Sequence, residues 1–308
     1  MAPLVADADL QARVKPITLT RYSAAVITLV NWARSVELIP SSSEEWDDLL
    51  LEFRYAHADR LTRSKFVLLV TALEFYMPNL KRQLAWSHAL LTGWARRGTI
   101  KHTVPLGKRA AFLIAIHLVA MGYKRLAAGL LLQVHTGLRP SEMLGILPEH
   151  LLFSEDQGAP AADLPLVIAL GVRFGTKVQR TQVAILRQEN SELIKILRAC
   201  KAATSEGFYL FPHTLTQYRS LLRTVERKLG LNVGWSPHGP RAGFASDARL
   251  AGWAFEEIRE AGRWQSDSSL RTYLDIVASA AVVRSMRQQG MARQLEVAER
   301  VWPSYFRA

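Results

Sequence analysis

The sequence predicts two mainly α-helical domains, with a small antiparallel β-sheet in the second. Apolar residues recur at spacings of three and four along most of the chain, which is typical of packed helices. Two apolar or β-branched runs, 164–170 and 182–186, flank a turn region around Gly175 and indicate strands. Residues 98–108 combine Gly, Pro and charge with little apolar pattern, so we expect an interdomain linker there. A length of 308 residues suffices for two domains.

Residues 17–97 are predicted to form a four-helix domain after a loose tail over residues 1–16. Helices favour starts at side chains that accept backbone N–H groups, and a capping box adds a Glu shortly afterwards. The expected starts are, in chain order, Thr18 or Thr20, the serines 41–43 followed by Glu44 and Glu45, Thr62, and Asn79. Gly98 is expected to end the last helix.

Residues 109–308 form the predicted second domain, in which the two strands separate an early pair of helices from a longer helical series. Apolar residues at spacings of three and four indicate these helices. The expected helices cover about residues 109–121, 124–136, 189–202, 213–229, 240–251, 254–261, 267–276 and 278–299.

The chain carries a net charge of +12, and this surplus bears on its partners. Nucleic acid is favoured because Lys and Arg neutralise phosphates, and a basic protein without a polyanionic partner is the alternative. Cys200 is the only cysteine, which excludes an internal disulfide and a multi-cysteine zinc site and suits a reducing compartment. No apolar run of about 18 residues and no secretory signal is visible. We expect an intracellular protein without a membrane span, in a bacterial cytoplasm or a nucleus.

Three segments combine residue types suited to phosphate chemistry. Residues 135–145 read HTGLRPSEMLG, residues 238–249 read HGPRAGFASDAR, and residues 262–275 read GRWQSDSSLRTYLD. Together they resemble the catalytic boxes of the tyrosine recombinase (phage integrase) family. Each box alone is a weak signal, but three boxes in the family's order with matched spacings are hard to obtain by chance.

The matched positions define the candidate catalytic residues. They are Arg139 and Glu142 in the first box, His238 and Arg241 in the second, and Trp264 and Tyr273 in the third. Two spacings also match those of the family: 23 residues separate Arg241 from Trp264, and nine separate Trp264 from Tyr273.

The resemblance covers about residues 105–280 and extends more loosely to the N-terminal helices. It implies that residues 17–97 are a SAM-like core-binding domain, that residues 109–308 are the catalytic domain, and that the two form a C-shaped clamp on double-stranded DNA. It further implies a homotetramer on DNA and no metal or cofactor. Family members pass a C-terminal helix to a neighbouring subunit, and packing of that helix on its own domain is the alternative.

The chemistry of the boxes explains their residue types. Arginine stays protonated and binds two phosphate oxygens at once, so Arg139 and Arg241 are expected to clamp the scissile phosphate. His238 is expected to donate to the phosphate or to accept the tyrosine proton. Tyr273 is the expected nucleophile. The family implies a 3′-phosphotyrosine bond and a free 5′-hydroxyl, so that rejoining requires neither ATP nor metal.

The leaving 5′-oxygen needs an acid, which in this family is a lysine on a β-hairpin between the first two boxes. Here the candidate hairpin reads VRFGTKVQRTQVAIL, and Lys177 is its only lysine. Lys177 is therefore identified with that acid, and a solvated turn charge is the alternative. Arg173 and Arg180 share the hairpin and are candidate DNA contacts.

Trp264 departs from the commoner family pattern, which has histidine at this position. Indole is neither acid nor base at neutral pH, but its N–H can donate to a phosphate oxygen and its ring can pack against the tyrosine-bearing helix. The Tyr273 proton is then expected to pass to His238 or to a phosphate oxygen. Glu142 follows Arg139 by three residues and is expected to orient its guanidinium, with an ordinary surface glutamate as the alternative.

Outside the boxes, one predicted helix carries further candidates. His213, Arg219 and Arg223 lie at the start of the helix over 213–229 or along it, and could contact DNA. His135 lies on an apolar helix and is interpreted as a core histidine.

The predicted function is site-specific DNA recombination or integration, of the kind mobile elements use. Three alternatives are a type IB topoisomerase-like DNA relaxation activity, a domesticated DNA-binding protein without turnover, and a helical interaction protein unrelated to DNA. The intact set of Arg139, Lys177, His238, Arg241 and Tyr273 speaks against loss of turnover.

Overall fold

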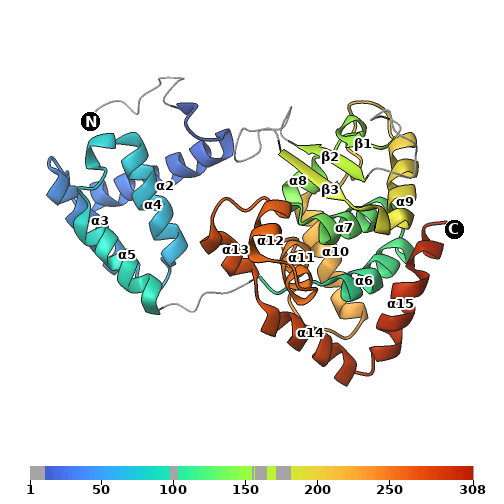
Figure 1. Ribbon diagram of the computed structural model, residues 1–308. Coiled ribbons are helices and arrows are strands. Elements are labelled where there is room, and N and C mark those ends of the chain that lie inside the picture. Colours follow the sequence, from blue (N-terminus) through green and yellow to red (C-terminus); the bar gives the residue numbers. More distant parts are fainter. Residues whose placement is uncertain (1–10, 98–102, 155, 157–164, 171–181, 308) are drawn as a thin grey trace. The chain divides into compact units, whose positions relative to one another are not determined.

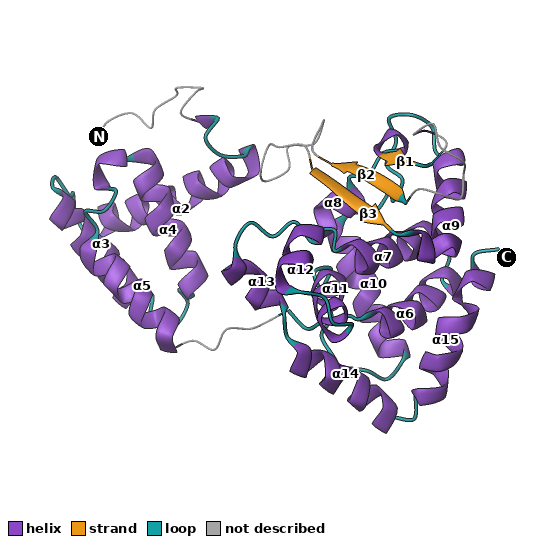
Figure 2. Ribbon diagram, in the orientation of Figure 1, coloured by secondary structure: helices purple, strands orange, loops and turns teal. Residues whose placement is uncertain are grey.

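The computed structural model describes residues 11–97, 103–154, 156, 165–170 and 182–307 (Figure 1). The chain divides into two compact units, Met1–Ile100 and Lys101–Ala308. The described parts are mainly helical, with a small sheet in the second unit, as the sequence predicts (Figure 2). None of the helices in these ranges combines the length and apolar character needed to cross a membrane.

The first unit packs its helices around one apolar core. Leu29, Leu50, Phe66 and Leu73 are fully buried in it. The described α-helices of this unit are α2 (Pro16–Ser35), α3 (Ser43–Ala56), α4 (Arg63–Tyr76) and α5 (Ala85–Arg97), and the 3-10 helix η1 (Pro78–Leu80) lies between the last two.

Two of the predicted helix starts in this unit are confirmed. The Ser42 side chain accepts the Glu45 N–H at the start of α3, and the Thr62 side chain accepts the Lys65 N–H at the start of α4. The prediction for α2 was wrong, since neither Thr18 nor Thr20 caps it. The helix begins at Pro16, whose fixed φ and missing N–H suit a first helical position.

The predicted start of α5 at Asn79 was also wrong, because Asn79 lies in η1. Helix α5 begins at Ala85, where the buried Asp47 carboxylate of α3 accepts the Trp86 and Ser87 N–H groups at 2.7 and 2.9 Å. A side chain 39 residues away thus supplies the cap, which local sequence does not indicate.

The second unit sets a three-stranded antiparallel sheet beside its helices (Figure 2). The sheet order is β1 (Leu151–Leu152), β2 (Leu166–Leu170) and β3 (Gln182–Leu186), with Ile168 paired to Leu151 and Ala184. The α-helices are α6 (Lys108–Ala120), α7 (Lys124–Thr136), α8 (Pro140–Leu144), α9 (Ser191–Ala202), α10 (Leu215–Lys228), α11 (Gly239–Leu250), α12 (Phe255–Ala261), α13 (Asp267–Tyr273), α14 (Ile276–Gln288) and α15 (Ala292–Tyr305).

The core of this unit is organised around α7. Every residue from Leu126 to Val134 is buried, as expected for a helix covered on all sides. Helix α7 contacts α6, α9, α11 and β3. It therefore gives a rigid base to the loop that follows it, which carries the first box.

The C-terminal part differs from the prediction of one helix over 278–299. It forms α14 and α15, separated at Gly290, whose left-handed φ of 80° ends the first helix. Helix α15 packs on α6 of the same chain, where Trp302 stacks on Phe112 with centroids 5.4 Å apart. Exchange of this helix between subunits stays a prediction.

We expect Asp47→Ala to lower the free energy of unfolding of the first unit by about 2 kcal/mol, because the buried Ser87 N–H and the partly buried Trp86 N–H lose their acceptor. Thermal and urea unfolding of the full chain, followed by tryptophan fluorescence, would measure it. Asp48→Ala is the matched control, since Asp48 is exposed on the same helix. Equal stability of the two variants would contradict the capping role.

Candidate active site

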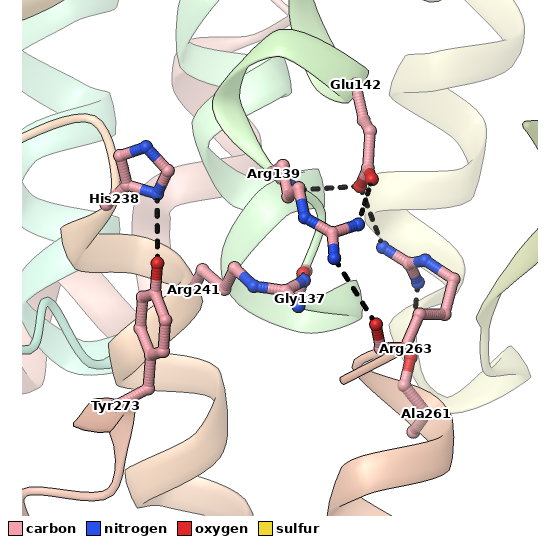
Figure 3. Close-up of polar contacts among 8 residues, drawn as sticks. All are labelled: Gly137, Arg139, Glu142, His238, Arg241, Ala261, Arg263 and Tyr273. Atoms are coloured by element: carbon pink, nitrogen blue, oxygen red, sulfur yellow. Dashed lines mark hydrogen bonds and ion pairs between the residues drawn. The ribbon is translucent and has the colours of Figure 1, made fainter. Parts of the chain in front are cut away.

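The three boxes meet around the N-terminus of α11, which carries His238 as its N-cap and Arg241 in its first turn (Figure 3). Helix α11 lies directly against the segment before α6. A Cβ at Gly243 would lie 2.0 Å from the Leu106 carbonyl oxygen, so only glycine permits this approach. The Asp247 carboxylate of α11 accepts the Lys108 N–H at 2.7 Å and caps α6.

Buried polar contacts also position His238. Gln133 of α7 donates to the Pro237 carbonyl at 2.9 Å and accepts the Tyr218 hydroxyl at 3.0 Å. Both side chains are fully buried, so the backbone just before His238 is tied to the core helix.

The first box places Arg139 at the end of a tight turn. Helix α7 ends at Gly137, which adopts a left-handed φ of 63°, and Arg139 is the N-cap of α8. The Glu142 carboxylate accepts the Arg139 backbone N–H at 2.8 Å and its guanidinium Nη1. Burial would raise the pKa of Glu142, but Arg263 and Arg139 outweigh it and lower that pKa.

Arg241 is the most buried cation of the site, with 1% of its surface exposed. Its Nη1 donates to the Gly137 carbonyl, and its guanidinium lies over the Trp264 ring at 3.9 Å. Burial, together with Arg139 and Arg263, lowers the pKa of Arg241 to about 9, which leaves it charged at neutral pH. Within the part of the chain that the structure describes, this guanidinium has no ion-pair partner, and a bound anion would supply one.

The Tyr273 hydroxyl lies 3.5 Å from Nδ1 of His238 (Figure 3). Burial lowers the pKa of His238, and Arg241, Arg139 and Arg219 lower it further. The imidazole is therefore neutral at neutral pH. With its proton on Nε2, Nδ1 can accept the phenol proton.

Trp264 packs against the tyrosine-bearing helix, as the sequence indicates, with its ring centroid 5.7 Å from that of Tyr273. Its ring lies 3.9 Å from the Arg241 guanidinium and stacks on Phe244, with centroids 6.5 Å apart and an interplanar angle of 14°. Its indole N–H is buried and has no hydrogen-bond partner among the described residues. Gly262 leaves room for this ring, since a Cβ there would lie 1.7 Å from it. In this arrangement Trp264 acts as a platform for Arg241.

Arg263 is a site residue that sequence reasoning missed. Its guanidinium donates to Glu142 at 3.0 Å, and its carbonyl accepts from Arg139 at 3.4 Å. The only signal for Arg263 in the sequence was its position next to Trp264. Nothing in the sequence indicates that it pairs with Glu142, 121 residues away.

The remaining candidates are more dispersed. Lys177, Arg173 and Arg180 lie outside the described residues. Arg219 and Arg223 are exposed on α10, and Arg219 is close enough to act on His238. His213 precedes the N-cap Thr214 and packs edge-on against Tyr123.

His135 lies on α7 and is partly buried. Its Nδ1 contacts the Leu131 carbonyl at 2.8 Å, and its ring lies beside Phe112. Burial lowers the pKa of His135 to about 4. The ring is therefore neutral under ordinary conditions.

The described residues of the site bring together three guanidiniums, one carboxylate, a neutral imidazole and a phenol. The formal surplus of +2 in a largely buried setting suits a phosphodiester and the charge that builds up on it. Within the described ranges no group of three or more His, Cys, Asp or Glu residues could hold a metal ion.

Comparison of the structure with solved structures identifies its fold. It is similar to the XerH site-specific recombinase bound to its difH substrate, with a TM-score of 0.59, 15% identity, and coverage of 83% of this chain and 75% of that chain. It is also similar to a lambda integrase dimer bound to a COC′ core site, with a TM-score of 0.57, 13% identity, and coverage of 85% and 90%. The chain has the tyrosine recombinase fold.

A third similar structure with this fold is the Tn1549 transposon integrase in complex with transposon right end DNA. The TM-score is 0.56 at 14% identity, over 91% of this chain and 97% of that chain. A scan against protein-family models and a search of curated protein sequences find no match. The chain is therefore similar to these proteins in fold, and the fold class predicted from the sequence is confirmed.

We expect His135 to make the stability of the protein sensitive to acid. The pKa of His135 lies below its ordinary value, so stability present above pH 6.5 is lost as the pH falls toward 4. Wild type should lose about 2–3 kcal/mol more than His135→Gln between pH 7 and pH 4.5. Urea unfolding at both pH values measures this.

His117→Gln is the matched control for His135→Gln. His117 makes the same contact to the carbonyl four residues earlier, on α6, and is likewise partly buried. Equal acid sensitivity of wild type and His135→Gln would contradict this prediction.

Proposed function

We propose that this chain is a site-specific DNA recombinase that cuts and rejoins double-stranded DNA through a bond between Tyr273 and a 3′-phosphate. The observation that carries the proposal is the Tyr273 hydroxyl beside the neutral His238, next to the buried Arg241. A nucleophile, a base and cations for a phosphate thus meet at one place. The structural neighbours that are site-specific recombinases and integrases bound to DNA support the substrate class.

In the proposed cleavage step, Arg139 and Arg241 bind the non-bridging oxygens of the scissile phosphate. Tyr273 attacks phosphorus and passes its proton to Nδ1 of His238. The bond to the 5′-oxygen breaks, and a 3′-phosphotyrosine forms. The guanidiniums stabilise the charge that develops in the transition state, and they do so strongly because they are largely shielded from water.

The leaving 5′-oxygen takes a proton, which we assign to Lys177 on the basis of the sequence alone. Rejoining reverses these steps: a 5′-hydroxyl attacks the phosphotyrosine, and the phenol leaves with the proton held on His238. Because the covalent bond conserves the energy of the cut linkage, the residues named are sufficient for both directions. We propose a homotetramer on DNA for strand exchange between two sites.

Tyr273→Phe should abolish covalent attachment to a nicked duplex that traps the cleaved intermediate. His238→Ala should slow attachment about 10²–10⁴-fold, because the phenol loses its base. Gel separation of protein–DNA adducts measures both. Tyr305→Phe is the control, since Tyr305 is exposed at the end of α15. Undiminished attachment by Tyr273→Phe would require another nucleophile.

Arg241→Met should change stability and activity in opposite directions. Removal of a buried cation that neighbouring guanidiniums repel should raise the melting temperature, whereas covalent attachment should fall about 10²–10³-fold. Calorimetry and the adduct assay measure the two effects. Arg249→Met, at the exposed end of the same helix, should alter neither. A lower melting temperature together with normal attachment would contradict the role of Arg241.

Strand exchange between two defined sites distinguishes recombination from relaxation of supercoiled DNA by a type IB topoisomerase-like activity. We expect the protein to exchange strands between the two DNA sites. Relaxation without exchange would favour the topoisomerase alternative, and salt-dependent DNA binding without adducts would indicate a protein that keeps the fold without turnover.

A further inference from the structure

Arg263 adopts a backbone conformation that is unusual for its residue type. Its φ of 57° lies in the left-handed region, which favours glycine. Its side chain is nevertheless long, charged and only 7% exposed. Such a combination persists only where surrounding contacts stabilise it.

Two of those contacts link Arg263 to Arg139, in addition to its local bond to the Ala261 carbonyl. Glu142 accepts the Arg139 guanidinium on Oε1, and on Oε2 it accepts both Arg263 Nη2 at 3.0 Å and the Arg139 backbone N–H at 2.8 Å (Figure 3). The Arg263 carbonyl accepts Arg139 Nη2 at 3.4 Å. Arg263 therefore holds Arg139 twice, through Glu142 and through its own backbone.

The side chain of Arg263 also changes the charge available to a phosphate. Without it, Glu142 would pair with Arg139 alone and neutralise that guanidinium. With it, one carboxylate is shared between two cations, so the positive charge of Arg139 is less fully neutralised by Glu142. Arg263 itself is turned toward Glu142 and Ala261, so it acts through Arg139.

We propose that Arg263 is a positioning residue that makes the orientation and charge of Arg139 depend on the docking of the segment that carries Tyr273. The inference rests on the proposed function, because phosphate cleavage is what Arg139 serves. Arg263, Trp264 and Tyr273 lie on one segment, and Arg139 lies on another. Arg139 gains its second acceptor, and Glu142 its second cation, only when the two segments meet.

Arg263→Gly is the informative variant because glycine keeps the left-handed backbone and removes only the side chain. We expect its rate of covalent attachment to the nicked duplex to fall about 10–100-fold, with the DNA Kd changed less than about threefold. Arg263→Lys should recover most of the rate. Arg259→Met is the control for lost charge, because Arg259 pairs with Asp267 at the surface.

Glu142→Gln tests the route through the carboxylate. If Arg263 acts through Glu142, Arg263→Gly should cost less in the Glu142→Gln background than in wild type, so that the two effects are not additive. Additive losses, a normal rate for Arg263→Gly, or equal losses for Arg263→Lys and Arg263→Gly would each overturn the proposal.

A readout without cleavage separates this proposal from the proposed function. The guanidinium Nη–H resonances of Arg139, assigned with Arg139→Lys, should be protected from exchange in wild type and Arg263→Lys and unprotected in Arg263→Gly, because these groups donate to Glu142 and to the Arg263 carbonyl. Equal protection in all three overturns the positioning role. Absence of wild-type adducts would instead overturn the recombinase proposal and leave this measurement to judge Arg263.

Discussion

The buried guanidinium of Arg241 is the constraint on which the site depends. It is held by the Gly137 carbonyl and the Trp264 ring, and among the described residues no carboxylate forms an ion pair with it. Burial of a cation costs free energy, so the groups that contact it must be well placed to offset that cost. The left-handed turn at Gly137 and the space left by Gly262 are parts of that arrangement. The first and third boxes both contact this one side chain of the second.

The same electrostatic field acts on the imidazole. Burial lowers the pKa of His238, and the charges of Arg241, Arg139 and Arg219 lower it further, which favours the neutral ring. The cluster that would attract a phosphate thus also prepares a base for the phenol. Stability and chemistry are opposed here, because the cations that favour anion binding repel one another in its absence.

Local signals in the sequence were reliable where a helix is governed by its own residues. Ser42 and Thr62 cap α3 and α4 as predicted, and the runs at β2 and β3 form strands. The errors share a cause. Helix α5 begins where the distant Asp47 accepts its N–H groups, and the C-terminal region divides at Gly290 although apolar periodicity continues on both sides. Tertiary contacts and a single backbone angle overrode the local pattern.

The sequence by itself determined the fold class and the chemical types at the candidate site, because box order and spacing are linear properties. Only the tertiary structure decided how those groups are used. It turned the Trp264 N–H inward, placed His238 beside the Tyr273 hydroxyl, and brought in Arg263. The physical reason is that burial, shared counter-ions and hydrogen-bond distance depend on segments far apart in the chain, and no spacing within one segment encodes them.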